Sequence, residues 1–176
     1  MERARQSTYT TLHDTNQHDM FDAGIETTYL VLEFAMVELM NNRHVMAKLQ
    51  AEVRRRRTPA SNQEEPRQDV LTEEELGDMA YLRATVKETL RLHPPGPLLI
   101  PHLSIADCQI DGYMIPAGTR LIVNAWALAR DPASWEMPEE FMPERLLPGG
   151  SAAALNGKGK DFEYLPLAPD GGSAQA

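Results

Sequence analysis

The sequence Glu88-Thr89-Leu90-Arg91 lies near the end of a predicted helix over residues 78–92. This helix has to stop before Pro94-Pro95, because proline excludes helical backbone at the residue that precedes it. Glu88 and Arg91 stand three residues apart, so their side chains occupy neighbouring positions on the helix surface. An exposed pair of this kind contributes only about 0.5 kcal/mol. The pair therefore becomes informative only together with the sequence around it.

Helical patterning continues upstream of this stretch. Over residues 19–55 apolar side chains recur at mixed steps of three and four, which predicts one long helix with apolar residues on more than one side. Residues 58–69 are polar and contain proline, as loops do. Thr72 and Glu75 have the spacing of a capping box, which marks a helix start. The long helix would need neighbouring elements on several of its faces.

Downstream of Pro97 the periodicity becomes that of short strands. Strands are predicted at residues 98–100, 108–110, 113–115 and 119–123, with Asp111-Gly112 as a tight turn, and a short helix at residues 124–130. The chain is then rich in proline and glycine. The sequence thus predicts a mainly α fold with a small β-sheet, followed by an irregular meander.

Composition excludes several classes of function. The net charge of −9 argues against a general nucleic-acid binder, and the lone Cys108 excludes an internal disulfide framework. No apolar run approaches the roughly 20 residues that span a bilayer, and no signal peptide opens the chain. The histidines show no convincing metal-binding spacing, so no metal ligand is assigned.

Three further motifs accompany Glu88-Thr89-Leu90-Arg91. They are Ala23-Gly24-Ile25-Glu26-Thr27-Thr28, Phe141-Met142-Pro143-Glu144-Arg145 and Phe162-Glu163-Tyr164-Leu165-Pro166. In this order and at this spacing the four motifs resemble the C-terminal part of a cytochrome P450, a haem-thiolate monooxygenase, most closely of the plant microsomal type. The resemblance covers residues 19–166, with residues 1–18 as a polar lead-in. It implies a partial cytochrome P450 fold with a long distal-type helix, a clamp helix, a β-hairpin region and a meander, and it implies that N-terminal helices cover the long helix.

The first motif is assigned by this resemblance to the helix that crosses the distal face of haem b. Gly24 and the neighbouring threonines weaken the helix locally and permit a kink. An acid beside a hydroxyl can organise water and deliver protons. The match makes Thr27 the oxygen-activating hydroxyl and Glu26 its acidic partner. Ala23 and Gly24 are the small residues that let the cofactor lie against the helix.

The clamp of the resembled family is formed by the second and third motifs. The match places Glu88, Arg91 and Arg145 together in a buried cluster that holds the meander against the helix, because guanidinium and carboxylate groups pair directionally. Leu146 follows Arg145 where the family usually has phenylalanine.

Two more positions acquire roles through the match. His102 falls where an arginine or histidine contacts a haem propionate, although a plain loop histidine is the alternative from spacing alone. The apolar residues that fall where the family lines its substrate pocket are Leu98, Leu99 and Ile100.

The last motif is followed by a departure from the family pattern. A Gly-rich loop with the cysteine that ligates haem iron is expected, but residues 167–176 read Leu-Ala-Pro-Asp-Gly-Gly-Ser-Ala-Gln-Ala. Removing one base from an encoding of a family-like loop reproduces the sequence over residues 165–176, so we interpret this tail as a frameshift. Cys108 is rejected as the iron ligand, because it precedes a hairpin turn and lacks the Gly-rich surroundings of such a thiolate.

The activity implied for the parent protein is insertion of one oxygen atom of O2 into an apolar small molecule. Electrons would come from a flavoprotein reductase at the endoplasmic reticulum membrane, in plant secondary metabolism. Without the cysteine loop, the chain as written is expected to form no thiolate-ligated centre, and to be soluble or misfolded. Two alternatives remain: an inert pseudogene or truncated product, and a small helical interaction protein that binds a partner through exposed apolar faces.

Overall fold

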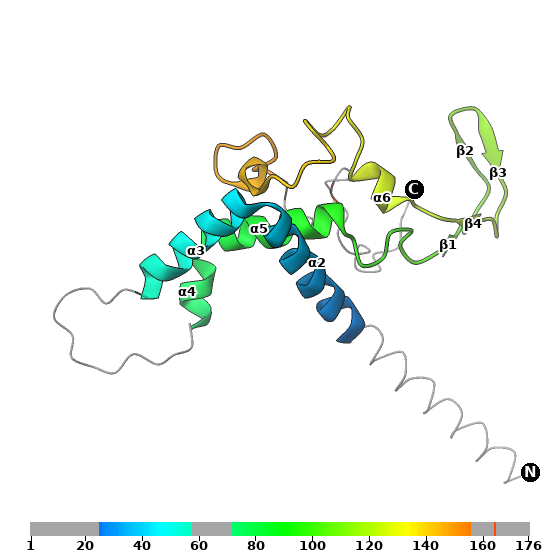
Figure 1. Ribbon diagram of the computed structural model, residues 1–176. Coiled ribbons are helices and arrows are strands. Elements are labelled where there is room, and N and C mark those ends of the chain that lie inside the picture. Colours follow the sequence, from blue (N-terminus) through cyan, green and yellow to red (C-terminus); the bar gives the residue numbers. More distant parts are fainter. Residues whose placement is uncertain (1–24, 58–71, 156–163, 165–176) are drawn as a thin grey trace, which may run out of the picture.

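The computed structural model describes residues 25–57, 72–155 and 164. The helices are α2 (Thr27–Asn41), α3 (Arg43–Arg57), α4 (Glu73–Gly77), α5 (Ala80–Leu92), α6 (Ala125–Leu128) and the 3-10 helix η2 (Pro143–Leu146). The strands are β1 (His102–Leu103), β2 (Cys108–Ile110), β3 (Tyr113–Ile115) and β4 (Arg120–Leu121). Helix α5 lies between the α2–α3 pair and the segment that carries η2, and the β2–β3 hairpin projects at the far end (Figure 1).

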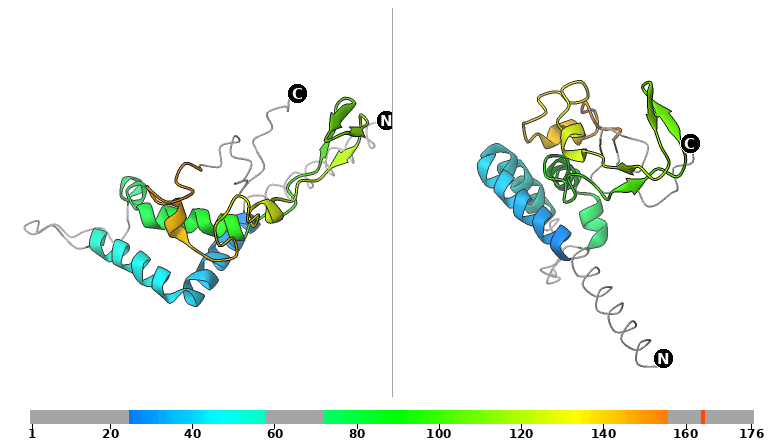
Figure 2. Two further views of the ribbon diagram at one scale, coloured as in Figure 1. Left: turned by 90° about the horizontal axis from the view of Figure 1, so that it is seen from above. Right: turned by 90° about the vertical axis from the view of Figure 1, so that its right-hand side faces the viewer.

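The single helix predicted over residues 19–55 is wrong, because the chain bends between α2 and α3 (Figure 2). Asn42 lies at the bend with φ −106° and ψ 72°, outside helical backbone. Its amide donates to the Glu38 carbonyl at 2.8 Å, and its own carbonyl accepts from the Val45 amide at 2.9 Å. Asn42 thus ends α2 and begins α3, in keeping with the tendency of asparagine to compete with helical hydrogen bonding. The predicted start of this helix before residue 25 lies outside the described residues, as do the loop over residues 58–69 and the tail over residues 167–176.

Helix α5 is joined to α3 at its first turn. The Glu52 carboxylate of α3 accepts hydrogen bonds from the Tyr81 amide at 3.0 Å and the Leu82 amide at 2.9 Å. These amides have no acceptor within their own helix, and the positive end of the helix dipole favours an acid there. The predicted capping box is confirmed at the start of α4, the helix before α5. There Thr72 and Glu75 exchange hydrogen bonds.

The predicted hairpin is confirmed as the antiparallel pair β2–β3. Its turn residues Asp111 and Gly112 both have positive φ, 50° and 84°, as a two-residue type I′ turn requires. A second antiparallel pair joins β1 to β4, with His102 opposite Leu121.

The strand predicted at residues 98–100 is wrong. Leu99 has φ 51°, and its amide donates to the Gly96 carbonyl at 3.0 Å, so the apolar run belongs to a turn. The strand predicted at residues 119–123 is shorter, as β4, and the helix predicted at residues 124–130 is α6. The Asn124 side chain caps α6 by accepting from the Ala127 amide at 3.0 Å.

Among the described residues two apolar clusters form the core, and α5 contributes to both. One consists of Ala84, Trp135, Leu146, Ala152 and Tyr164, and the other of Leu39, Val45, Leu92 and Phe141. Within α2 only Leu39 is buried, whereas Tyr29, Leu32, Met36 and Met40 are each more than half exposed. Helix α2 therefore has apolar side chains that the described part of the chain leaves uncovered.

Candidate functional site

Glu88, Arg91 and Arg145 meet in a buried cluster between α5 and η2, with exposed fractions of 0%, 1% and 3%. Arg91 binds the Glu88 carboxylate through two atoms, Nε and Nη2, each at 2.9 Å. Arg145 donates from Nε to the Glu88 Oε1 atom at 3.1 Å. The structure thus brings together the three residues that the family resemblance places in a clamp.

Each of the two guanidinium groups also makes three hydrogen bonds to backbone carbonyls of the meander. Arg91 donates to the carbonyls of Ala129 at 2.6 Å, Pro138 at 2.8 Å and Glu140 at 3.1 Å. Arg145 donates to the carbonyls of Glu136, Met137 and Glu140. The Glu88 carboxylate also accepts the Met142 amide at 3.0 Å. Residues 129–145 are therefore held against α5 by buried charges that are paired and hydrogen-bonded, the condition under which such charges are tolerated.

Two aromatic residues cover the clamp, and sequence reasoning assigned a role to neither of them. The Trp135 ring lies 4.9 Å from Cζ of Arg91 and 6.0 Å from Cζ of Arg145, within cation–π range. Tyr164, from the last motif, packs edge-on against Trp135 and donates from its hydroxyl to the Lys87 carbonyl at 3.0 Å. Burial raises the pKa of Tyr164 and the Glu88 charge raises it further, so its hydroxyl remains a donor. The sequence offered one sign of this role, since Trp135 is a large aromatic residue within a Pro- and Gly-rich stretch.

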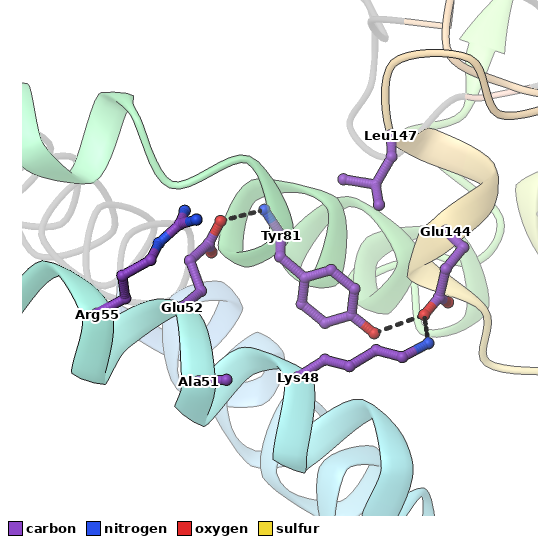
Figure 3. A pocket seen from close by; sticks show the side chains of 7 residues that line it. All are labelled: Lys48, Ala51, Glu52, Arg55, Tyr81, Glu144 and Leu147. Carbon is purple, nitrogen blue, oxygen red and sulfur yellow. Dashed lines mark hydrogen bonds and ion pairs between the residues drawn. The ribbon is translucent and has the colours of Figure 1, made fainter.

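A second polar cluster surrounds a surface pocket of about 440 Å³ (Figure 3). The Glu144 carboxylate accepts from Lys48 at 2.6 Å and from the Tyr81 hydroxyl at 2.8 Å, and so connects η2 with α3 and α5. Burial, and then the hydrogen bond to Glu144, raise the pKa of Tyr81. Partial burial opposes ionisation of Glu144, but the hydrogen bonds from Lys48 and Tyr81 outweigh it, and the pKa of this carboxyl lies below its usual value. Sequence reasoning missed this cluster, whose members are up to 96 residues apart.

The glutamate and arginine of the Pro-Glu-Arg motif therefore serve opposite sides of η2. Arg145 points into the buried clamp, and Glu144 points to the pocket between η2 and α3. The bond of Arg145 to Glu88 and the bond of Glu144 to Lys48 both hold η2 in place. The motif therefore also fixes where the chain leaves η2, after Leu146.

The distal-type motif lies apart from the clamp. Ala23 and Gly24 lie outside the described residues. The kink that the sequence predicts at Gly24 therefore lies outside them as well. Glu26 is exposed and Thr27 is half-buried at the start of α2, at the end of this helix that lies away from η2 (Figure 1). The structure does not bring Glu26 and Thr27 together with the residues of the clamp.

The other residues assigned through the resemblance are largely open to solvent. His102 is exposed on β1. Leu98 and Ile100 are 50% and 69% exposed, and Leu99 is half-buried. These apolar side chains remain available for contacts with groups beyond the described residues.

The described residues do not complete a haem-thiolate site. Such a site needs a thiolate that faces the cofactor, and Cys108 lies half-buried on β2, opposite Ile115 of the hairpin. This hairpin lies away from α2 in Figures 1 and 2. Within the described ranges no group of three or more His, Cys, Asp or Glu side chains could hold a metal ion. No helix in those ranges has both the length and the apolar character to cross a membrane.

Comparison with known proteins supplies the remaining evidence. The family model for cytochrome P450 matches residues 5–167. Indolin-2-one monooxygenase of Zea mays is 59% identical over 149 residues, which cover 85% of this chain and 27% of that protein. The 3-hydroxyindolin-2-one monooxygenase of Zea mays is 56% identical, with coverage of 85% and 26%. A zebra fish cytochrome P450 solved with progesterone is similar in structure, with a TM-score of 0.66, 28% identity, and coverage of 87% of this chain and 31% of that chain. The chain thus spans about a quarter of the length of the curated relatives it matches.

Proposed function

Because the chain belongs to the cytochrome P450 family, we propose that it forms the C-terminal part of a haem-dependent monooxygenase. The whole protein would insert one oxygen atom of O2 into an apolar small molecule. The observation that carries the proposal is the buried clamp of Glu88, Arg91 and Arg145, whose donors are directed to meander carbonyls. Such a cluster fixes the backbone that leads to the last motif.

Haem b is the cofactor of this family, and when bound it supplies the oxygen chemistry. The described residues lack a suitably placed thiolate, so our proposal concerns only what the chain's own side chains do. Thr27 would hold a water or O2 by its hydroxyl, and Glu26 would pass protons to it from solvent. The exposure of Glu26 suits this role, because a carboxylate in contact with water can be reprotonated between turnovers.

The substrate that we propose for the whole protein is an indole-type compound. Three similar proteins of Zea mays are named for such substrates: indolin-2-one monooxygenase, 3-hydroxyindolin-2-one monooxygenase and indole-2-monooxygenase, at 59%, 56% and 51% identity. The exposed apolar side chains of Leu98 and Ile100 suit contact with a flat apolar ring. Leu99, which separates them, lies in a turn that its amide closes by donating to the Gly96 carbonyl at 3.0 Å.

The setting that we propose follows from the plant relatives. The parent protein would work at the endoplasmic reticulum membrane, and a flavoprotein reductase would supply its electrons. The chain by itself is expected to show no monooxygenase turnover, because its one cysteine lies in the β2–β3 hairpin.

A second candidate function rests on α2. Tyr29, Leu32, Met36 and Met40 form an uncovered apolar surface on this helix, and surfaces of this kind often bind other proteins. The chain could then act as a small helical interaction protein. A cooperative thermal transition of the chain without haem would favour this candidate, and a non-cooperative transition would favour an inert fragment.

A chimera tests the main proposal at the level of haem binding. Residues 19–166 would replace the matching segment of Zea mays indolin-2-one monooxygenase, whose own haem loop would follow directly. We expect the reduced chimera to give a thiolate-type Soret band with carbon monoxide, as the unaltered relative does. A chimera that unfolds cooperatively but binds no haem would overturn the proposal.

A further inference from the structure

Lys87 of α5 is bonded to two later points of the chain, Leu155 and Tyr164. Its ammonium group donates to the Leu155 carbonyl at 3.2 Å, and its own carbonyl accepts from the Tyr164 hydroxyl at 3.0 Å. These partners lie 68 and 77 residues further along the sequence. The residues on either side of the segment 156–163 are thus attached to one turn of α5.

The ring of Trp135 connects Tyr164 to the clamp. It meets the Tyr164 ring edge-on, with centroids 6.4 Å apart and planes inclined by 66°, while Cζ of Arg91 lies 4.9 Å from its centre. Trp135 and Tyr164 are 3% and 2% exposed, and they belong to one apolar cluster with Ala84. Because Ala84 stands one helical turn before Glu88 on α5, this cluster lies directly beside the clamp.

A short turn fixes the backbone of Trp135. The Asp131 carbonyl accepts from the Ser134 amide at 3.0 Å and from the Trp135 amide at 2.9 Å. The Asp131 carboxylate accepts from the Ala133 amide at 2.9 Å, as aspartate does in many turns. Among the described residues, the buried indole Nε1 of Trp135 has no hydrogen-bond acceptor. The indole therefore acts on its described neighbours through the faces and edges of its ring.

The two contacts of Tyr164 restrict its position to different degrees. Edge-on aromatic pairs are favourable over a range of centroid distances of about 4.5–7 Å, so packing on Trp135 tolerates small shifts. Hydrogen bonds between a hydroxyl and a carbonyl oxygen span only about 2.5–3.0 Å and weaken steeply when misaligned. The bond to the Lys87 carbonyl therefore fixes the position of Tyr164 along α5 more closely than the packing does.

We propose that Tyr164 is a positioning residue that sets where the chain beyond Pro166 begins, through its bond to Lys87 and its packing on Trp135. We call these three residues, Lys87, Trp135 and Tyr164, the Lys87 anchor. Tyr164 stands two residues before Pro166, where the resemblance to the family ends. In the whole protein the next segment would be the haem-binding loop, so this inference rests on the proposed function. A shift of Tyr164 would displace the start of that loop while the clamp stays in place.

Tyr164→Phe in the Zea mays chimera tests the placement. The variant keeps the ring that packs on Trp135 but loses the bond to Lys87. We expect it to bind as much haem as the unaltered chimera, and to lose its thiolate-type Soret band with carbon monoxide about fivefold faster. Tyr113→Phe, at a tyrosine of β3 that is 74% exposed, is the matched control and should leave this rate unchanged. A lower midpoint of urea unfolding with an unchanged rate would show a purely structural role and overturn the proposal.

A double-mutant cycle on the full chain without haem tests the anchor separately from the proposed function. Tyr164→Phe and Trp135→Phe each keep an aromatic ring, and the double variant completes the cycle. Because Trp135 supports the ring that carries the hydroxyl, urea unfolding should show a coupling of at least about threefold in the folding equilibrium constant. Effects that simply add would contradict the anchor, whatever the chimera does. A coupled pair together with a chimera that binds no haem would support the anchor and overturn the proposed function alone.

Discussion

Arg91 donates to both oxygens of the Glu88 carboxylate at 2.9 Å, and neither side chain has any surface exposed to solvent. A buried pair of this kind contributes little by itself, because the loss of hydration offsets the attraction between the charges. Its importance here lies in direction, since Arg91 also donates to three particular carbonyls of the meander, those of Ala129, Pro138 and Glu140. The pair thereby defines where residues 129–145 run along α5.

Removing the central charge should be severe. In Glu88→Gln, Arg91 and Arg145 would remain buried next to each other without a carboxylate, which typically costs about 3–5 kcal/mol. Urea unfolding followed by circular dichroism measures the loss. Glu33→Gln, at an exposed glutamate of α2, is the control and should change stability by about 0.5 kcal/mol or less. A loss below about 1 kcal/mol in Glu88→Gln would contradict the clamp as described.

Charge alone should not be sufficient at Arg145. Arg145→Lys keeps the positive charge, but an ammonium cannot reach Glu88 and the three carbonyls of Glu136, Met137 and Glu140 at once. We expect a loss of about 2–3 kcal/mol, because buried carbonyls lose their donors. Near-wild-type stability in this variant would show that the directional bonds are unimportant.

The first turn of α5 should depend on a residue of another helix. Glu52→Ala removes the acceptor of the Tyr81 and Leu82 amides and should cost about 1–2 kcal/mol. Exchange of these two amides should accelerate more than that of the Ala152 amide. Glu52→Gln is the milder companion, because its amide oxygen can still accept one of the bonds. If Glu52→Ala and Glu52→Gln behave alike and close to wild type, the inter-helix cap has no energetic role.

Stability in acid should depend on Glu144. Its pKa is lowered in the folded chain, so the unfolded chain binds more protons and stability rises with pH through this range. The contribution is present above the ordinary glutamate pKa and is lost as pH falls through the folded value. Because Lys48 is 54% exposed, solvent screening limits it to about 1 kcal/mol or less. Glu144→Gln should flatten the acid limb of the stability curve, and an unchanged limb would exclude this contribution.

Short sequence motifs predicted correctly the helix ends and turns whose hydrogen bonds are made between residues close together in the sequence. Pro94-Pro95 ends α5, Thr72 with Glu75 begins α4, and Asp111-Gly112 forms the hairpin turn. In each case a few neighbouring residues determine the backbone conformation, so the sequence pattern is enough to predict the structure.

Two predicted elements are wrong because the local structure there depends on a contact between distant residues or on a turn. The helix over residues 19–55 bends because the Asn42 side chain binds Glu38, which His93 holds from 55 residues away. The apolar run at residues 98–100 follows Pro95-Gly96-Pro97, and the turn gives Leu99 a positive φ that no strand can contain. Neither effect is visible in apolar periodicity.

In the candidate site, too, some contacts were implied by the sequence motifs and others were not. The contact among Glu88, Arg91 and Arg145 is implied by the resemblance and is present in the structure. Its carbonyl partners and the Lys48–Glu144–Tyr81 cluster depend on how the meander folds back onto α5, which no short motif encodes. The roles of Glu26, Thr27 and His102 remain predictions.

The most direct test of the account is oxidation of indolin-2-one by the chimera that carries residues 19–166 in the Zea mays relative. With a plant flavoprotein reductase and O2, we expect hydroxylated product from the chimera and at least about a tenfold lower rate from its Thr27→Ala variant, with the carbon monoxide band retained in both. A chimera that binds haem through the relative's loop but oxidises neither indolin-2-one nor another indole-type compound would contradict the proposed function.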